Sequence, residues 1–137
     1  MATSPTKPSD PTTSNYKKAQ VLAINELVEE EVTLLIDGTT IICFASYSPY
    51  EIEVGKIYDV EITLNLSEHY EIRKLNSNEI LVERVGSSYS YALYGMLSQS
   101  KFQTFTLLND EEIHYDYPEL NDCFIKLTVE RIEASFR

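Results

Sequence analysis

The stretch EVTLLIDGTTIICFA, residues 31–45, decides the fold. Two apolar runs rich in β-branched residues flank Asp37 and Gly38, and both of these residues accept a positive φ at low cost. The stretch therefore predicts a tight hairpin between a strand at 31–36 and a strand that starts at Thr39. The second strand is apolar on both faces, which favours a central position in a sheet.

An echo of this strand occurs later in the chain. Residues 32–37 read VTLLID and residues 105–110 read FTLLND. Each copy is followed by an alternating strand, at residues 58–66 and 124–132. The echo predicts a barrel or sandwich built from two similar meanders.

The whole pattern predicts an all-β fold of about seven to nine short antiparallel strands. Four glycines and little helical periodicity support this class. Residues 20–30 fit both a helix and a strand, and a strand is favoured because the next segment is ready to pair with it. Residues 80–85 are predicted as a short strand, with a short helix over 79–85 as the alternative. A further strand is expected over 112–117.

The last strand contains a change of phase. Apolar residues in 125–129 alternate on one phase, and those in 132–136 alternate on the other. A phase change requires an extra residue, so a bulge or bend is predicted near Glu130 and Arg131. Such a bend lets one strand cross between two sheets.

The N-terminal segment differs in composition from the rest. Residues 1–15 hold three of the five prolines and no large apolar residue after Met1, so they are predicted to be a disordered tail. Residues 16–137 are predicted to form a single all-β domain, with two pseudo-repeated halves at 19–66 and 89–136 as the alternative.

The chain also lacks two signals that would change its expected location. It has no apolar run long enough for a membrane span and no apolar region typical of a secretory signal near Met1. A cytoplasmic protein is expected.

The net charge is −11, and it is unevenly distributed. Met1 to Lys18 carry three lysines and one aspartate, so the remaining residues carry 8 basic and 21 acidic side chains. A nucleic-acid-binding face requires a basic stripe, so a nucleic-acid partner is not expected. A protein partner with a basic surface fits this charge better.

Motifs for phosphate, metal and redox chemistry are missing from the sequence. No Walker or dinucleotide-binding glycine pattern occurs, and His69, His114, Cys43 and Cys123 lack the short spacings of a zinc site. No cofactor and no metal are predicted. The two cysteines are expected to be buried thiols that act as small hydrophobic residues.

His114 and Asp116 are the one candidate catalytic pair in the sequence. If 112–117 is a strand, His114 and Asp116 share a face, and the carboxylate can orient the imidazole. A nucleophile such as Ser98 or Ser100 would be needed, and the sequence places neither one nearby. The chain is predicted to be non-enzymatic.

Tyrosine is the one residue type whose surplus suits a functional role, with ten tyrosines and no tryptophan. Tyrosine combines a large apolar area with a polar tip, which suits interfaces, although packing in the core or at the rim of a barrel is the other use. The candidate binding residues are Tyr47, Tyr50, Tyr89, Tyr91, Tyr115 and Tyr117.

The strand spacing and the bend near Glu130 resemble OB-fold and SH3-like small β-barrels over residues 19–136, and no specific family motif accompanies the resemblance. An OB fold implies oligonucleotide binding on a strand face that bears aromatic residues, here Tyr89 and Tyr91. The first hypothesis is a non-enzymatic protein-binding or accessory module of the immunity or inhibitor type. The alternative is an OB-like binder of single-stranded nucleic acid.

Overall fold

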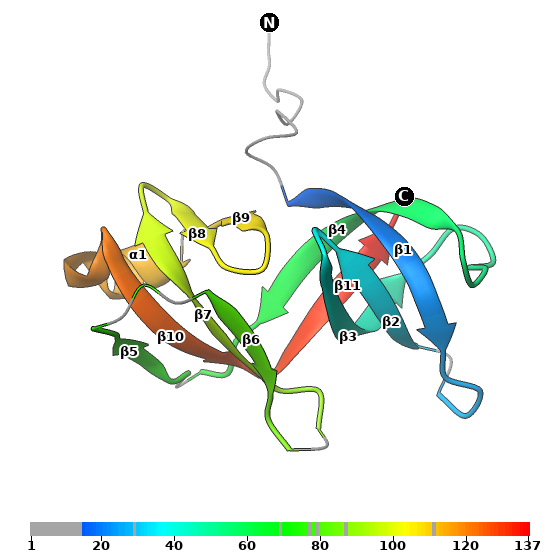
Figure 1. Cartoon of the computed structure of the whole chain (residues 1–137), viewed down its shortest axis with the longest axis horizontal. Coiled ribbons are helices and arrows are strands. Elements are labelled where there is room, and N and C mark those ends of the chain that lie inside the picture. The colour runs from blue at the N-terminus through cyan, green and yellow to red at the C-terminus, as the bar shows by residue number, and fades with distance from the viewer. Residues whose placement is uncertain are drawn as a thin grey trace, which may run out of the picture.

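The computed structural model describes residues 15–28, 30–68, 70–76, 78, 80–86, 88–110 and 112–137. The predicted tail lies outside the described residues, apart from Asn15. The described residues form an all-β molecule whose strands lie in two sheets, accompanied by one α-helix and one 3-10 turn (Figure 1).

Within this part of the chain there are eleven strands, more than the sequence predicts. They are β1 Tyr16–Ile24, β2 Glu31–Ile36, β3 Thr39–Tyr47, β4 Ile57–Asn65, β5 Ile72–Lys74, β6 Leu81–Arg84, β7 Tyr91–Ser98, β8 Lys101–Gln103, β9 Leu107–Asn109, β10 Cys123–Val129 and β11 Arg131–Phe136. Two interruptions add to the number of strands. A bend at 104–106 separates β8 from β9, and Glu130 separates β10 from β11.

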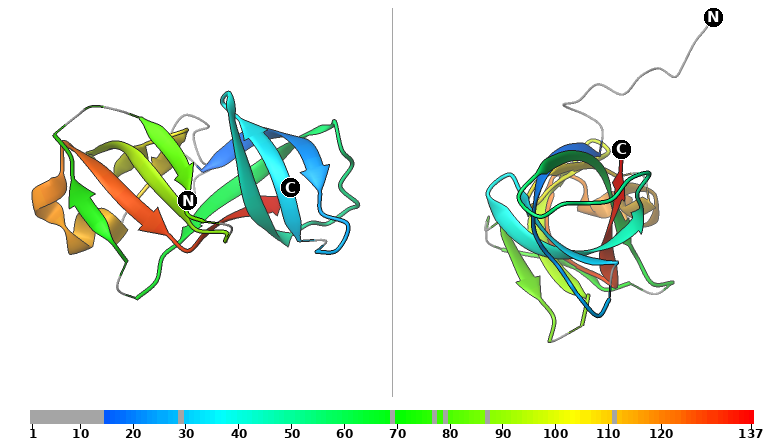
Figure 2. Two further views of the ribbon diagram at one scale, coloured as in Figure 1. Left: turned by 60° about the horizontal axis from the view of Figure 1, so that its bottom comes forward. Right: turned by 90° about the vertical axis from the view of Figure 1, so that its right-hand side faces the viewer.

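The first sheet is a closed ring of five strands, in the order β1-β2-β3-β11-β4, and β4 pairs back onto β1. Neighbouring strands in the ring are antiparallel except β3 and β11, which run parallel. Figure 2 shows the ring nearly end-on in its right-hand view. Inside the ring, alternate residues of each strand are fully buried, for example Val21, Leu34, Ile41 and Phe136.

The predicted hairpin joins β2 to β3. Ile36 pairs with Thr39, and between them Asp37 and Gly38 have φ values of 47° and 81°. Two consecutive positive φ angles belong to the tight turn whose twist matches that of the flanking strands. The hairpin prediction is therefore confirmed.

The second sheet has the order β5-β10-β7-β8-β9, and β6 pairs with β7. Its inner face packs with the interior of the ring in one hydrophobic core cluster. Gly95 of β7 lies where the chain folds closely over itself, because a Cβ there would come within 2.1 Å of the Gln103 carbonyl oxygen. Glycine is the residue that permits this approach.

The predicted bend at Glu130 connects the two sheets. β10 belongs to the second sheet and β11 to the ring, as the phase change indicates. The Glu130 backbone is held on both sides: its amide donates to the Asn65 carbonyl at 2.8 Å, and its carbonyl accepts from the Ser90 hydroxyl at 3.2 Å. Because β11 completes the ring, the sheets do not follow the halves 19–66 and 89–136.

Two segments resolve ambiguities left by the sequence. The strand favoured within 20–30 is present but ends at Ile24, because Asn25 begins a turn in which its side-chain oxygen accepts from the amides of Leu27 and Val28. Residues 81–84 form strand β6, and the alternative helix over 79–85 does not form where the chain is described.

The strand predicted over 112–117 is wrong. Residues Glu112–Asp116 form helix α1, followed by the 3-10 turn η1 at Pro118–Leu120. The cause is Asp110, whose carboxylate accepts hydrogen bonds from the amides of Ile113 and His114, both at 2.9 Å. An aspartate in this position satisfies the first free amides of a helix.

Candidate functional site

The first two candidate tyrosines lie at one end of the ring. Tyr47, the last residue of β3, has an exposed fraction of 55%. Tyr50 lies in the following loop, where its ring stacks on Tyr58 with centroids 5.4 Å apart and its hydroxyl donates to the Arg137 carbonyl oxygen at 2.5 Å. Tyr50 thus fastens the loop to the C-terminal residue, whereas Tyr47 presents an exposed ring.

Tyr89 and Tyr91 lie between the two sheets. The Tyr89 hydroxyl donates to the Glu31 carboxylate at 2.8 Å, and its ring meets Phe44 edge-on at 6.4 Å. Tyr91 is only 4% exposed, and its hydroxyl oxygen accepts from the Ile42 amide at 2.8 Å. Both side chains contact strands of the five-stranded ring in the same molecule, so they form no open surface on which nucleic-acid bases could stack.

Tyr115 and Tyr117 lie at the far end of the second sheet. Tyr115, on α1, has an exposed fraction of 86%. Tyr117 is half-buried and meets Tyr70 edge-on, with ring centroids 5.9 Å apart. The six candidate tyrosines therefore occupy three separate places and do not converge on one site.

His114 and Asp116 do not form the pair considered in the sequence, because α1 is a helix and residues two apart on a helix do not face each other. The Asp116 carboxylate accepts from the Tyr70 hydroxyl at 2.8 Å. His114 instead lies with Nδ1 2.5 Å from the Asp110 carboxylate, and its Nε2 accepts from the Ser100 amide at 3.1 Å. Since Nε2 accepts, the imidazole proton lies on Nδ1 and points to Asp110. His114 thus ties α1 to the turn after β7.

The two serines considered as nucleophiles do not complete a catalytic group with this imidazole. The Ser98 hydroxyl donates to the Asp122 carboxylate at 3.0 Å. Ser100 contacts His114 through its backbone amide.

Candidate metal ligands do not gather in the described part of the chain: no three His, Cys, Asp or Glu side chains come together there as a metal site. Both cysteines are free thiols. Cys43 is fully buried, which raises its thiol pKa, and Cys123 is half-buried.

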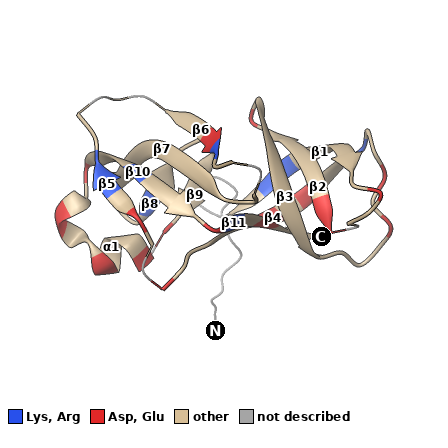
Figure 3. Ribbon diagram, turned by 90° about the horizontal axis from the view of Figure 1, so that it is seen from below, with Lys and Arg blue, Asp and Glu red and all other residues tan. Residues whose placement is uncertain are grey.

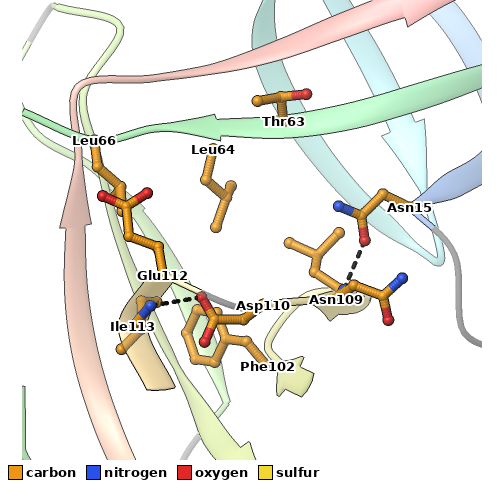
Figure 4. Close-up of a pocket in the computed structure, with 10 residues that line it drawn as sticks. Asn15, Thr63, Leu64, Leu66, Phe102, Asn109, Asp110, Glu112 and Ile113 are labelled. Carbon is orange, nitrogen blue, oxygen red and sulfur yellow. Dashed lines mark hydrogen bonds between the residues drawn. The ribbon is translucent and has the colours of Figure 1, made fainter. Parts of the chain in front are cut away.

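A pocket of about 180 Å³ lies between the ring and the second sheet. Its apolar lining consists of Leu64, Leu66, Phe102, Leu108 and Ile113, and its polar lining of Asn15, Thr63, Asn109, Asp110 and Glu112. Figure 4 shows Leu64 reaching into this inter-sheet pocket from β4, between Glu112 on one side and Asn109 on the other.

Hydrogen bonds hold the polar wall of the inter-sheet pocket in place. The Asn15 side-chain oxygen accepts from the Asn109 amide at 2.6 Å, and the Asn15 carbonyl accepts from the Ile62 amide at 2.9 Å. Asp110 is fixed by its bonds to the start of α1. The wall is therefore tied both to the ring and to the second sheet.

Carboxylates predominate on the side of the inter-sheet pocket that the second sheet and α1 form. Residues 102–125 contain no lysine or arginine. Exposed carboxylates occur at Glu112, Asp116, Glu119 and Asp122, and α1 carries red segments in Figure 3. We call residues 110 and 112–122 the acidic cap. An apolar pocket beside this cap is suited to a side chain with an aliphatic stem and a cationic end, as in lysine or arginine.

Sequence reasoning missed the inter-sheet pocket. Its lining comes from segments near residues 15, 64, 102 and 112, and only folding brings these together. One signal was present: Asp110 follows a short strand and precedes Glu112, which is typical of the start of a helix.

Comparison with known proteins places the chain in a family. A family model described as "Uncharacterised conserved protein UCP019853" matches residues 15–137, so the chain belongs to this family. Neither the curated proteins nor the solved structures contain a significant match. In the described residues, no helix has the length and apolar character that crossing a membrane requires.

Proposed function

We propose that the protein is a non-enzymatic binding module that recognises a basic protein surface. A lysine or arginine side chain of the partner enters the inter-sheet pocket, and the acidic cap surrounds the entering residue. The observation that carries this proposal is the combination of an apolar lining with the carboxylates of Asp110 and Glu112 in one pocket. An accessory protein of the immunity or inhibitor type would bind in this way.

The chemistry of the inter-sheet pocket supports this occupant. Leu64, Leu66 and Ile113 offer apolar surface to an aliphatic stem, and Glu112 offers a carboxylate to its cationic end. Asp110 is already occupied by the helix amides and by His114, so Glu112 is the carboxylate available for a new ion pair. Acidic surroundings chiefly raise the rate of association with a basic partner.

The five-stranded ring supports an OB-like small barrel as the architecture of this module. Along the sequence, the strands of the second sheet lie between β4 and β11. Tyr89, just before β7, contacts β2 of the ring, and Tyr91 of β7 contacts β3. These contacts favour protein binding over the alternative of stacking nucleic-acid bases on Tyr89 and Tyr91.

A pair of short peptides tests the proposal. One peptide carries a single central lysine between glycines, and the other carries norleucine, which keeps the aliphatic stem but lacks the charge. We expect the lysine peptide to shift the NMR signals of Leu64 and Ile113, and we expect the norleucine peptide to bind more weakly. Raising the salt concentration to about 1 M should weaken the lysine complex, because the Debye length falls to about 3 Å.

Matched variants locate the contact. Glu112→Gln removes a carboxylate of the inter-sheet pocket, whereas Glu119→Gln removes one from the same acidic cap outside it. We expect only the first substitution to abolish the shifts of Leu64 and Ile113. Equal losses in both variants, or equal binding of the two peptides, would show that the pocket is not the site.

A further inference from the structure

Two positive charges face each other on the outer surface of the second sheet. Arg73 of β5 is the direct cross-strand partner of Lys126 of β10, and Lys126 in turn pairs with Tyr94 of β7. Directly opposed residues of an antiparallel pair project from the same face, and like charges there are destabilising. Blue segments mark β5 and β10 in Figure 3. The arrangement is unexpected in a chain that has twice as many acidic as basic residues.

Neither of these two cations forms an ion pair with a described carboxylate. Other cations do so: Lys18 lies 2.7 Å from Asp59, and Arg137 lies 2.5 Å from Glu61. Lys126 instead makes a cation-π contact, with its Nζ 5.7 Å from the centroid of the Tyr94 ring.

The two cations line a groove of about 430 Å³. Tyr70 and Tyr117 provide ring surface, and Thr128 adds a hydroxyl group. The Tyr70 hydroxyl is held by Asp116. We call this the basic groove. Its volume lies in the range of sites for small ligands, which is roughly 300–1,000 Å³.

We propose that the basic groove binds the phosphate group of a small ligand of mononucleotide size. The Arg73 guanidinium and the Lys126 ammonium hold the phosphate between them, and Thr128 donates its hydroxyl. The ring of the ligand lies against Tyr117. A doubly charged phosphate neutralises both cations and removes the repulsion between the two strands.

This site goes beyond the proposed function. None of its lining residues lines the inter-sheet pocket, although Tyr117 belongs both to the basic groove and to the acidic cap. Its ligand carries the opposite charge to a lysine side chain, so the peptide and phosphate titrations test the two proposals separately.

Glu71 allows the proposal to predict opposite changes in phosphate affinity for different variants. Glu71 also lines the basic groove, and its carboxylate opposes the entry of an anion. We expect Glu71→Gln to tighten phosphate binding, whereas Arg73→Gln and Lys126→Gln weaken it about tenfold or more, as the loss of a charge-assisted hydrogen bond does.

The experiment is an NMR titration of the full-length protein with inorganic phosphate and with a nucleoside monophosphate. We expect saturable shifts of the Arg73, Lys126 and Thr128 amides, which are lost in Arg73→Gln and Lys126→Gln. Lys101→Gln is the matched control, because it removes a positive charge from β8 of the same sheet outside the groove. A thermal melt of each variant confirms that it is folded.

The affinities for the two ligands distinguish a phosphorylated small molecule from free phosphate. Tighter binding of the nucleoside monophosphate supports a phosphorylated small molecule that uses the Tyr117 surface, and equal binding supports free phosphate at the same two cations. The proposal is overturned if neither ligand causes saturable shifts, or if Lys101→Gln weakens binding as much as Arg73→Gln. Binding of a single-stranded oligonucleotide without binding of either small ligand also overturns it.

Discussion

The hydroxyl oxygen of Tyr91 accepts a 2.8 Å hydrogen bond from the backbone amide of Ile42, so a side chain of the second sheet completes the backbone bonding of the ring. β3 and β11 pair only from Phe44 onward. Two residues earlier, the Tyr91 hydroxyl serves as acceptor for the β3 amide. The two sheets are therefore joined by a specific polar contact as well as by the shared core.

Tyr91→Phe tests this contact. The substitution keeps the ring but leaves the Ile42 amide without its acceptor, at a cost of about 1–3 kcal/mol. Chemical denaturation measures the loss in the free energy of unfolding. Tyr115→Phe is the control, because the exposed Tyr115 hydroxyl should change stability by less than about 0.5 kcal/mol. Equal stabilities of Tyr91→Phe and the unmodified protein would contradict the structural role of the bond.

Gly95→Ala should destabilise the second sheet. The added methyl group would come within 2.1 Å of the Gln103 carbonyl oxygen and 2.9 Å of the Thr104 Cα, both of which are backbone atoms. The backbone must move to accept it, and overpacking of this kind costs about 1–3 kcal/mol or more. We expect a lower melting temperature and faster hydrogen exchange at Phe102 and Gln103. An unchanged melting temperature would mean that β8 lies further from β7.

The elements that the sequence predicted well depend on local chemistry. Asp37 and Gly38 determine the hairpin by their tolerance of positive φ. The bend at Glu130 follows from a change of phase within one strand, which is visible without any knowledge of the partner strands. Alternation likewise locates β4, whose residues Val60 and Ile62 are buried as expected.

The features that were not predicted from the sequence have two causes. Either a strand-like pattern and a helix signal compete in the same segment, or the feature depends on contacts between residues that are far apart in the chain. Ile113, Tyr115 and Tyr117 alternate as in a strand, and this pattern concealed the helix that Asp110 starts. The echo at 105–110 includes that same aspartate, yet the second copy ends in a helix rather than a hairpin. The inter-sheet pocket joins residues as distant as Asn15 and Ile113, so no local pattern predicts it.

Asp110→Ala should loosen α1. The variant loses the acceptor for the Ile113 and His114 amides, and loss of such a helix cap costs about 0.5–2 kcal/mol. Because the Asp110 carboxylate also orients His114, the hydrogen bond from the Ser100 amide should weaken as well. Hydrogen exchange at Ser100, Ile113 and His114 measures both effects. Asp122→Ala, which lies after η1, should leave exchange at Ile113 unchanged.

Glu31 should make folding stability depend on pH in the acid range. Hydrogen bonds from Asn25 and then Tyr89 lower the pKa of its carboxyl group below the ordinary value of 4.5. A group whose pKa is lower in the folded state stabilises the fold above its unfolded pKa, and it loses this contribution as the pH falls through the folded pKa. Stability should therefore decline as the pH falls below about 4.5, and the decline should be smaller in Glu31→Gln.

Glu53→Gln is the matched control for this pH dependence. Glu53 carries the same kind of carboxyl group on the exposed loop before β4, where its one side-chain partner is the exposed Lys56 within the described residues. Urea unfolding at several pH values between 3 and 7 compares the three proteins. If Glu31→Gln and the unmodified protein lose stability in parallel over this range, the hydrogen bonds from Asn25 and Tyr89 do not favour the ionised carboxylate. The Tyr89 contact between the sheets would then rest on the edge-on packing of its ring against Phe44.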